Sequence, residues 1–145
     1  MGETIEGEVF DAKLAGKIIC LVVEDTKVGV QRIRQIFDGR FHLIVVGYLE
    51  DAENTLRTLA AQKLLDVVVT NLTIKRDLDG FQVFKMVKEV AQDVLIVVWT
   101  KHSDSEIQRA LQAGADFGVR KYTDDEASMA EAIIAVLKQR KEEEI

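Results

Sequence analysis

The sequence predicts an α/β domain built on a doubly wound, five-stranded parallel sheet with five helices. Two observations predict it. Five short apolar runs rich in β-branched residues read as buried parallel strands. They alternate with five amphipathic segments that have the 3.6-residue period of helices. Such alternation is typical of parallel strands joined by right-handed helical crossovers. With 145 residues, the chain is long enough for one domain with a buried core.

The strands and helices follow one another from Lys17 onward. We expect strands at residues 17–23, 42–47, 65–70, 94–99 and 116–120. We expect helices at residues 26–38, 51–62, 81–91, 103–113 and 124–140. In the first helix, for example, Val30, Ile33 and Phe37 recur on one helical face. Gly114 directly follows the fourth predicted helix and is a typical C-terminal cap.

Composition divides the chain into three parts. Residues 1–16 are an acidic N-terminal extension, which we expect to fray or to form one helical turn. Residues 17–140 hold the alternating strands and helices, and residues 141–145 form a charged tail. Because this tail leaves no room for a second domain, we expect any output to pass to a separate protein or to a second copy of the chain.

Charge and hydropathy argue against two classes of partner. The net charge is −6, whereas nucleic-acid binding needs clustered Lys and Arg. No apolar stretch reaches about 18 residues, so we expect no membrane span. The single cysteine, Cys20, lies in an apolar run and is interpreted as a small buried hydrophobe. Since one cysteine cannot form an internal disulfide, we expect a cytoplasmic protein.

Polar side chains follow four of the predicted strands at the point where each strand ends. They are Glu24 and Asp25 after the first strand, Asn71 after the third, Thr100 after the fourth and Lys121 after the fifth. Because the carboxyl ends of parallel strands lie at one edge of a sheet, we expect these side chains to form one site. A carboxylate at position 71 would make this a phosphate-accepting, metal-assisted site, but the carboxamide of Asn71 is not a competent nucleophile.

Several of these residues also have simpler interpretations. Glu24 and Asp25 could be acids that cap the following helix, where negative charge is favourable. His42 and His102 stand alone in the sequence, so we interpret them as surface or capping residues without a metal role. Trp99 lies in an apolar run and is expected in the core.

Taken together, the strand-end residues resemble the receiver domain of two-component response regulators. The resemblance covers about residues 17–140 and rests on residues 21–25, 66–72, 79–83, 97–100 and 110–116 with Lys121. It implies the flavodoxin-like strand order 2-1-3-4-5. It puts Asn71 at the phospho-accepting position, and Thr100 and Lys121 at the switch and phosphate-contact positions. It puts Glu24 and Asp25 at a magnesium site, which we expect to be weak or vestigial.

Four residues depart from the pattern of that family. Asn71 is neutral and cannot accept a phosphoryl group in the usual way. Lys101 stands beside Thr100, where the family usually has a small residue. Gly118 stands where the family often has an aromatic switch residue. Tyr122 replaces the proline that usually follows the lysine, so we do not expect a cis peptide bond there.

These departures predict a pseudo-receiver, a non-enzymatic signalling domain that works by protein–protein contact without conventional aspartyl phosphorylation. We expect no cofactor apart from weakly held magnesium. The expected partner is a signalling kinase or an output protein that contacts about residues 103–140, with a homodimer as a further option.

Two alternatives stay open at this point. One is a conventional phospho-accepting receiver that carries an Asp-to-Asn change at position 71, or that uses Asp77 or Asp79 as acceptor. The other is a small flavodoxin-like cofactor-binding protein, although no glycine-rich phosphate-binding loop follows Asp25.

Overall fold

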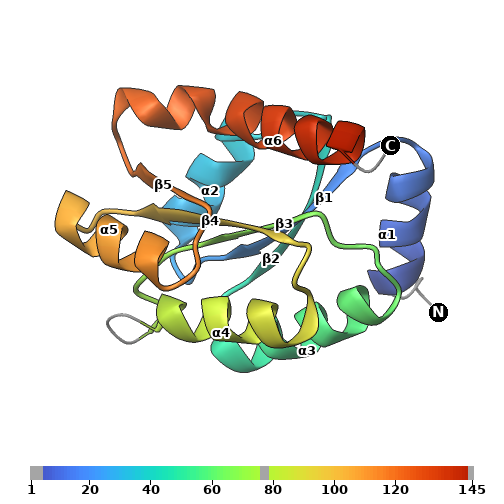
Figure 1. Ribbon diagram of the computed structural model, residues 1–145, viewed down its shortest axis with the longest axis horizontal. Helices are drawn as coiled ribbons and strands as arrows, with labels where there is room; N and C mark the ends of the chain where they lie inside the picture. Colours follow the sequence, from blue (N-terminus) through green and yellow to red (C-terminus); the bar gives the residue numbers. More distant parts are fainter. Residues whose placement is uncertain (1–4, 76–78, 144–145) are drawn as a thin grey trace.

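A single five-stranded sheet forms the centre of the structure, a computed structural model that describes residues 5–75 and 79–143 (Figure 1). The strands are β1 (Ile18–Val23), β2 (Phe41–Val46), β3 (Val67–Thr70), β4 (Leu95–Thr100) and β5 (Phe117–Arg120). All neighbouring strands are parallel, and their order is β2-β1-β3-β4-β5. The doubly wound parallel sheet and its flavodoxin-like strand order are therefore confirmed.

Helices cover both faces of this sheet. They are α1 (Ile5–Leu14), α2 (Lys27–Ile36), α3 (Leu49–Ala61), α4 (Gly80–Val90), α5 (Asp104–Gln112) and α6 (Met129–Glu143), with a 3-10 turn η1 (Asp124–Ser128) before α6. Figure 1 shows α3 and α4 on one face and α2 and α6 on the other. In the described part of the chain, no helix is both long enough and apolar enough to cross a membrane.

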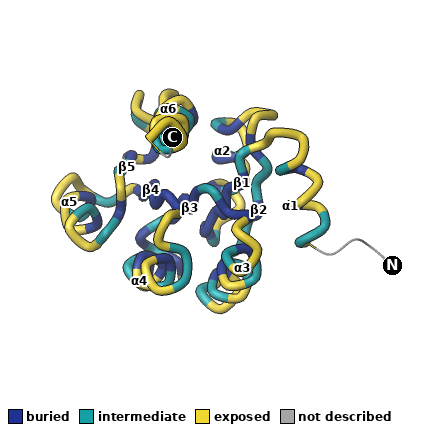
Figure 2. Tube along the Cα trace, turned by 45° about the vertical axis from the view of Figure 1, so that its right-hand side comes forward, coloured by how far each residue is buried: buried dark blue, intermediate teal, exposed yellow. Residues whose placement is uncertain are grey.

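Alternate residues of the strands supply two separate cores. In β1, Leu21 and Val23 pack in the core beneath α3 and α4, whereas Cys20 and Val22 pack in the core beneath α2 and α6. This follows from the two-residue period of a strand, which sends successive side chains to opposite faces. Trp99 is fully buried in the second core, as predicted. Figure 2 shows the buried strands enclosed by helices whose outer sides are exposed.

The N-terminal extension differs from the prediction. Residues expected to fray or to form one turn make the ten-residue helix α1, so the described residues form six α-helices and not the predicted five. Val9 and Ala12 of α1 are buried in the core beneath α3 and α4. Lys13 Nζ lies 2.7 Å from Oδ1 of Asp66, the residue directly before β3. The sequence does not predict this helix, because the apolar residues of α1 do not lie on one side of it.

The last predicted helix also differs, because it is divided in two. Its first turn is the 3-10 turn η1, and α6 then continues to Glu143, into the residues expected as a charged tail. Glu126 in η1 is buried, and it accepts hydrogen bonds from the backbone N–H of Tyr122 and from Arg32 Nε at 2.8 Å. The described residues contain no cis peptide bond, in agreement with Tyr122 replacing proline.

Candidate functional site

A hollow of about 510 Å³ opens at the carboxyl ends of the strands. Six of the residues singled out from the sequence line it: Asp25, Asn71, Thr100, Lys101, Lys121 and Tyr122. Two do not, because Glu24 is buried beneath the lining and Gly118 lies within β5. The strand-end rule thus brought together most of the predicted site.

The carboxylate of Glu24 is buried and holds an internal counter-ion. Lys121 Nζ lies 2.7 Å from Glu24 Oε2, and the two side chains are only 4% and 0% exposed. Glu24 Oε1 accepts from the hydroxyl of Thr26 at 3.0 Å and from its backbone N–H at 3.3 Å. A buried carboxylate is costly unless it is paired and hydrogen-bonded, and here both conditions are met.

A glycine in α2 makes room for this carboxylate. A Cβ atom at Gly29 would lie 2.5 Å from Glu24 Cδ, which is closer than real Cβ contacts. The backbone N–H of Gly29 is satisfied by the hydroxyl of Thr26 at 3.0 Å, so Thr26 is the N-cap of α2. The interpretation of Glu24 and Asp25 as the capping acids is therefore wrong.

The amide of Asn71 is oriented by its neighbours. Its Nδ2 donates to Glu24 Oε2 at 3.4 Å, and its Oδ1 accepts from the backbone N–H of Thr73 at 3.4 Å. Both bonds are longer than the usual 2.7–3.2 Å, so each is weak. The amide nevertheless turns its donor, and not its carbonyl oxygen, toward the buried carboxylate. A carboxylate at this position would instead repel Glu24.

Asp25 is tied to the loop after β3. Its Oδ2 accepts from the backbone N–H of Lys75 at 3.0 Å. Lys75 has a left-handed backbone with φ of 68°, and its ammonium lies 4.7 Å from the ring centroid of Tyr48. These contacts connect the end of β1 to the loop that precedes α4.

This donor set does not fit the magnesium ion that the resemblance implies. Magnesium prefers several oxygen ligands in near-octahedral geometry. One carboxylate, Glu24, is neutralised by an ammonium, and Asn71 turns its N–H group inward. Within residues 5–75 and 79–143, no three His, Cys, Asp or Glu side chains gather as metal ligands. We therefore assign no chemical step to a metal at this site.

Two loops meet above Thr100 through residues that the sequence analysis did not assign to the site. Thr100 Oγ1 accepts from the backbone N–H of His102 at 3.2 Å, and His102 Nε2 lies 2.9 Å from Thr73 Oγ1. The sequence pattern indicates a surface or capping role for His102, whereas the structure places it beside Thr100 and Thr73. Its position two residues beyond the end of β4 was the signal that could have placed it here.

Lys101 and Tyr122 form the rim of the hollow. Lys101 Nζ lies 5.3 Å from the ring centroid of Tyr122, and Arg32 approaches the same ring at 6.0 Å. Tyr122 is half exposed and has a left-handed backbone with φ of 62°. The ring is thus flanked by two cations, both within range of cation–π attraction.

Gly118 leaves no space for the aromatic side chain often found there in the family. A Cβ atom at this position would lie 2.5 Å from Ile107 Cγ2 of α5. Phe117 beside it packs toward the opposite core, beneath α2 and α6. Ile107 is buried and occupies the region that a switch residue at position 118 would need.

The alternative phosphoryl acceptors lie elsewhere. Asp79 is buried at the start of α4 and lines a separate depression together with Tyr48 and Lys75. Asp77 lies outside the described residues. For the cofactor-binding alternative, α2 begins directly after Thr26, with no glycine-rich loop between β1 and the helix.

Comparison with known proteins agrees with the fold. Residues 20–134 match the family model described as the response regulator receiver domain. The chain is 30% identical over 107 residues to the protein-glutamate methylesterase/protein-glutamine glutaminase 3 of Geobacter sulfurreducens. That alignment covers 74% of this chain but only 28% of the methylesterase.

Two solved structures share the fold. A CheY-like receiver domain protein of Methanospirillum hungatei superposes with a TM-score of 0.69 at 18% identity, over 88% of this chain and 98% of that one. An orphan response regulator of H. pylori superposes with a TM-score of 0.65 at 22% identity, over 84% of this chain and 98% of that one. The family match extends over most of the chain, and the sheet order agrees with it. The chain therefore belongs to the response regulator receiver domain family.

Proposed function

We propose that this receiver domain signals through protein–protein contact without conventional aspartyl phosphorylation and without catalysing a reaction. One observation carries the proposal: the Lys121 ammonium lies 2.7 Å from the buried carboxylate of Glu24, and the amide of Asn71 donates to the same oxygen. The group at the phospho-accepting position cannot attack phosphorus. The lysine that would bind an incoming phosphoryl group already has a buried partner.

Few of the side chains that the family uses to switch between conformations are present in this chain. A ligand shifts a conformational equilibrium only by its different affinity for the two states. Asn71 does not provide the covalent site, and Gly118 does not provide the aromatic side chain that would follow Thr100. The hydroxyl of Thr100 accepts a hydrogen bond from the His102 backbone. We therefore propose one dominant conformation that is determined by the sequence and not by phosphate.

The surface proposed to contact a partner is α5, β5 and α6, within residues 103–140. It is the family's usual contact surface, and it carries exposed charged pairs. In α5, for example, Arg109 lies 2.9 Å from Glu106. The proposed partner is a signalling kinase or a separate output protein.

The test is incubation with magnesium and a small phosphodonor such as acetyl phosphate, followed by intact-mass measurement. A conventional receiver treated in parallel shows that the donor is active. We expect no stoichiometric adduct on this chain. A stoichiometric adduct labile to hydroxylamine would overturn the proposal, and its loss in an Asp79→Asn variant would identify that residue as the acceptor.

A further inference from the structure

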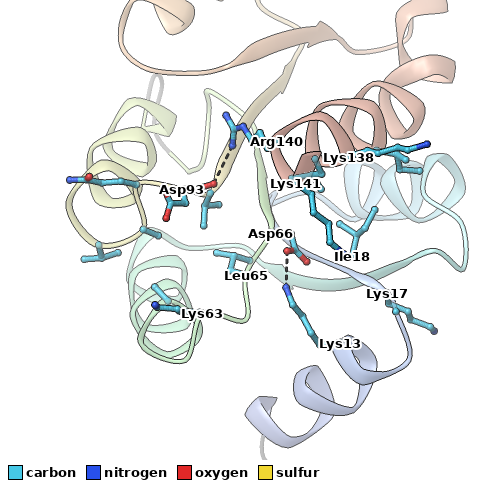
Figure 3. A pocket seen from close by; sticks show the side chains of 18 residues that line it. Lys13, Lys17, Ile18, Lys63, Leu65, Asp66, Asp93, Lys138, Arg140 and Lys141 are labelled. Atoms are coloured by element: carbon cyan, nitrogen blue, oxygen red, sulfur yellow. Dashed lines mark hydrogen bonds and ion pairs between the residues drawn. The ribbon is translucent and has the colours of Figure 1, made fainter. Parts of the chain in front are cut away.

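A second hollow, of about 970 Å³, lies at the opposite end of the sheet from the candidate site (Figure 3). Its lining has six cationic side chains, Lys13, Lys17, Lys63, Lys138, Arg140 and Lys141, against the two carboxylates of Asp66 and Asp93. The chain as a whole has a net charge of −6, so positive charge is concentrated here. The apolar part of the lining includes Ile18, Leu65 and Leu137.

Only part of this positive charge is neutralised by residues that the structure describes. Lys13 pairs with Asp66 at 2.7 Å, and Arg140 lies 3.4 Å from Asp116. Figure 3 shows the Lys13–Asp66 pair between α1 and α6. In contrast, Lys17, Lys63, Lys138 and Lys141 form no ion pair with any residue that the structure describes.

The helix ends facing this side of the sheet restrict what can bind. In a parallel α/β fold the C-terminal ends of the crossover helices lie beside the amino ends of the strands, and these ends are partially negative. Some of the lysines balance that charge, and a compact anion deep in the hollow would meet backbone carbonyls. The lining therefore suits a surface that brings carboxylates to the rim and apolar side chains to the floor.

Helix α1 has that combination on its outer side. Val9 and Ala12 are buried against the domain, yet Phe10 is 51% exposed and Leu14 is 72% exposed. Two apolar sides on one short helix are unusual, since a surface helix normally buries its single apolar stripe. Asp11 is exposed one turn before Leu14, and Glu8 is exposed one turn before Asp11; neither acid pairs with a cation in the described part of the chain.

We propose that a second copy of this chain covers the hollow with the outer side of its α1. Lys13 and Gly16, at the end of α1, themselves line the hollow. A two-fold axis beside α1 can therefore place each helix against the other copy's hollow, so that both contacts form together, as in an isologous dimer. Glu8 and Asp11 then face the free lysines, and Phe10 and Leu14 cover the apolar floor. This inference does not depend on the proposed function.

The first test is sedimentation velocity of the full chain at tens of micromolar. We expect a dimer that weakens as salt is added, because its rim contacts are charged. The Phe10→Ser/Leu14→Ser variant should raise the dimer dissociation constant at least about tenfold. Far-UV circular dichroism and thermal melting verify that each variant is folded. A natural chain that stays monomeric would overturn the proposal. If the amide signals of the lysines in that monomer shifted with added phosphate, the hollow would bind an anion instead.

The second test exchanges the charges. Lys138→Glu/Lys141→Glu reverses the charge of two side chains that line the hollow, and Glu8→Lys/Asp11→Lys reverses the charge of two side chains on α1. Each variant alone should therefore dimerise at least about tenfold more weakly. Mixing the two should restore a heterodimer, since both of its contacts again join opposite charges. Lys27→Glu/Lys85→Glu, on exposed lysines outside the hollow, is the matched control and should dimerise normally. A dimer unaffected by either reversal, or a mixture that stays monomeric, would contradict this arrangement.

Discussion

Lys121 and Glu24 form a buried ion pair of 2.7 Å at the ends of β5 and β1, strands that are not neighbours in the sheet. The pair crosses the site above β3 and β4, and it neutralises the carboxylate that would otherwise attract a cation. Its ammonium also lies 4.3 Å from the ring centroid of Trp99, which provides an optical signal for the site.

Lys121→Met should destabilise the domain by about 3–5 kcal/mol, because it leaves the Glu24 carboxylate buried without a counter-ion. The Glu24→Gln/Lys121→Met double variant should recover most of that loss, since no buried charge remains. Urea unfolding of the two variants and the natural chain measures both effects. A loss below about 1 kcal/mol in the single variant would show that the pair is unimportant for stability.

Magnesium should bind weakly or not at all at millimolar concentration. Of the two acids at the end of β1, Glu24 pairs with Lys121, whereas Asp25 pairs with no cation among residues 5–75 and 79–143. Titration followed by Trp99 fluorescence measures this directly. The Asn71→Asp variant is the comparison, and it should bind more tightly because it adds a carboxylate. Saturation of the natural chain well below millimolar would contradict the prediction.

Restoring Asp at position 71 should not restore long-range switching. We expect the Asn71→Asp variant with magnesium and beryllofluoride to show amide shifts only near the strand ends. Gly118 still lacks a side chain, and Ile107 occupies the adjacent space. Two-dimensional amide spectra test this. Large shifts throughout residues 100–125 would show that only the phosphoryl acceptor was missing.

Cys20 should be unreactive in the folded domain. Burial, assisted by the nearby charge of Asp66, raises the pKa of its thiol. The unfolded chain loses this proton above about pH 8.5, whereas the folded domain retains it, so folding stability should fall as pH rises above that value. Comparing the urea midpoints of the natural chain and Cys20→Ala at mildly alkaline and higher pH isolates this contribution. A thiol reagent should modify Cys20 only in urea, and rapid labelling without urea would contradict the expected burial.

The fold was predictable because the three central strands, β1, β3 and β4, are nearly continuous apolar runs, which is typical of strands buried on both faces of a parallel sheet. Helix α1 was not predictable by the same rule. Its inward Val9 and Ala12 are obscured by Phe10 and Leu14, which point outward, so no helical period is visible in the sequence. A hydrophobic pattern predicts a helix when the apolar residues are the buried ones. It does not predict a helix such as α1, in which apolar side chains are also exposed.

The site was predictable only as far as strand ends determine it. That rule brought Asn71, Thr100 and Lys121 to one hollow. The strand-end rule could not predict whether Lys121 would pair with Glu24 or with Asp25, because that pairing depends on the space that Gly29 leaves for the side chain of Glu24. It also missed the contact between Thr73 and His102, which depends on how two loops fold over the strand ends.

The close fit between Glu24 and Gly29 has a consequence for how this sequence can change. Alanine at position 29 would force the side chain of Glu24 to move, because the added methyl group would overlap its carboxylate, and that movement would disturb the pairing with Lys121. An aspartate at position 24, one methylene shorter, would remove the overlap but would leave a gap and draw back from Lys121. Neither position can change alone without loss. Among descendants of this sequence, the glutamate and the glycine should therefore be kept together or replaced together.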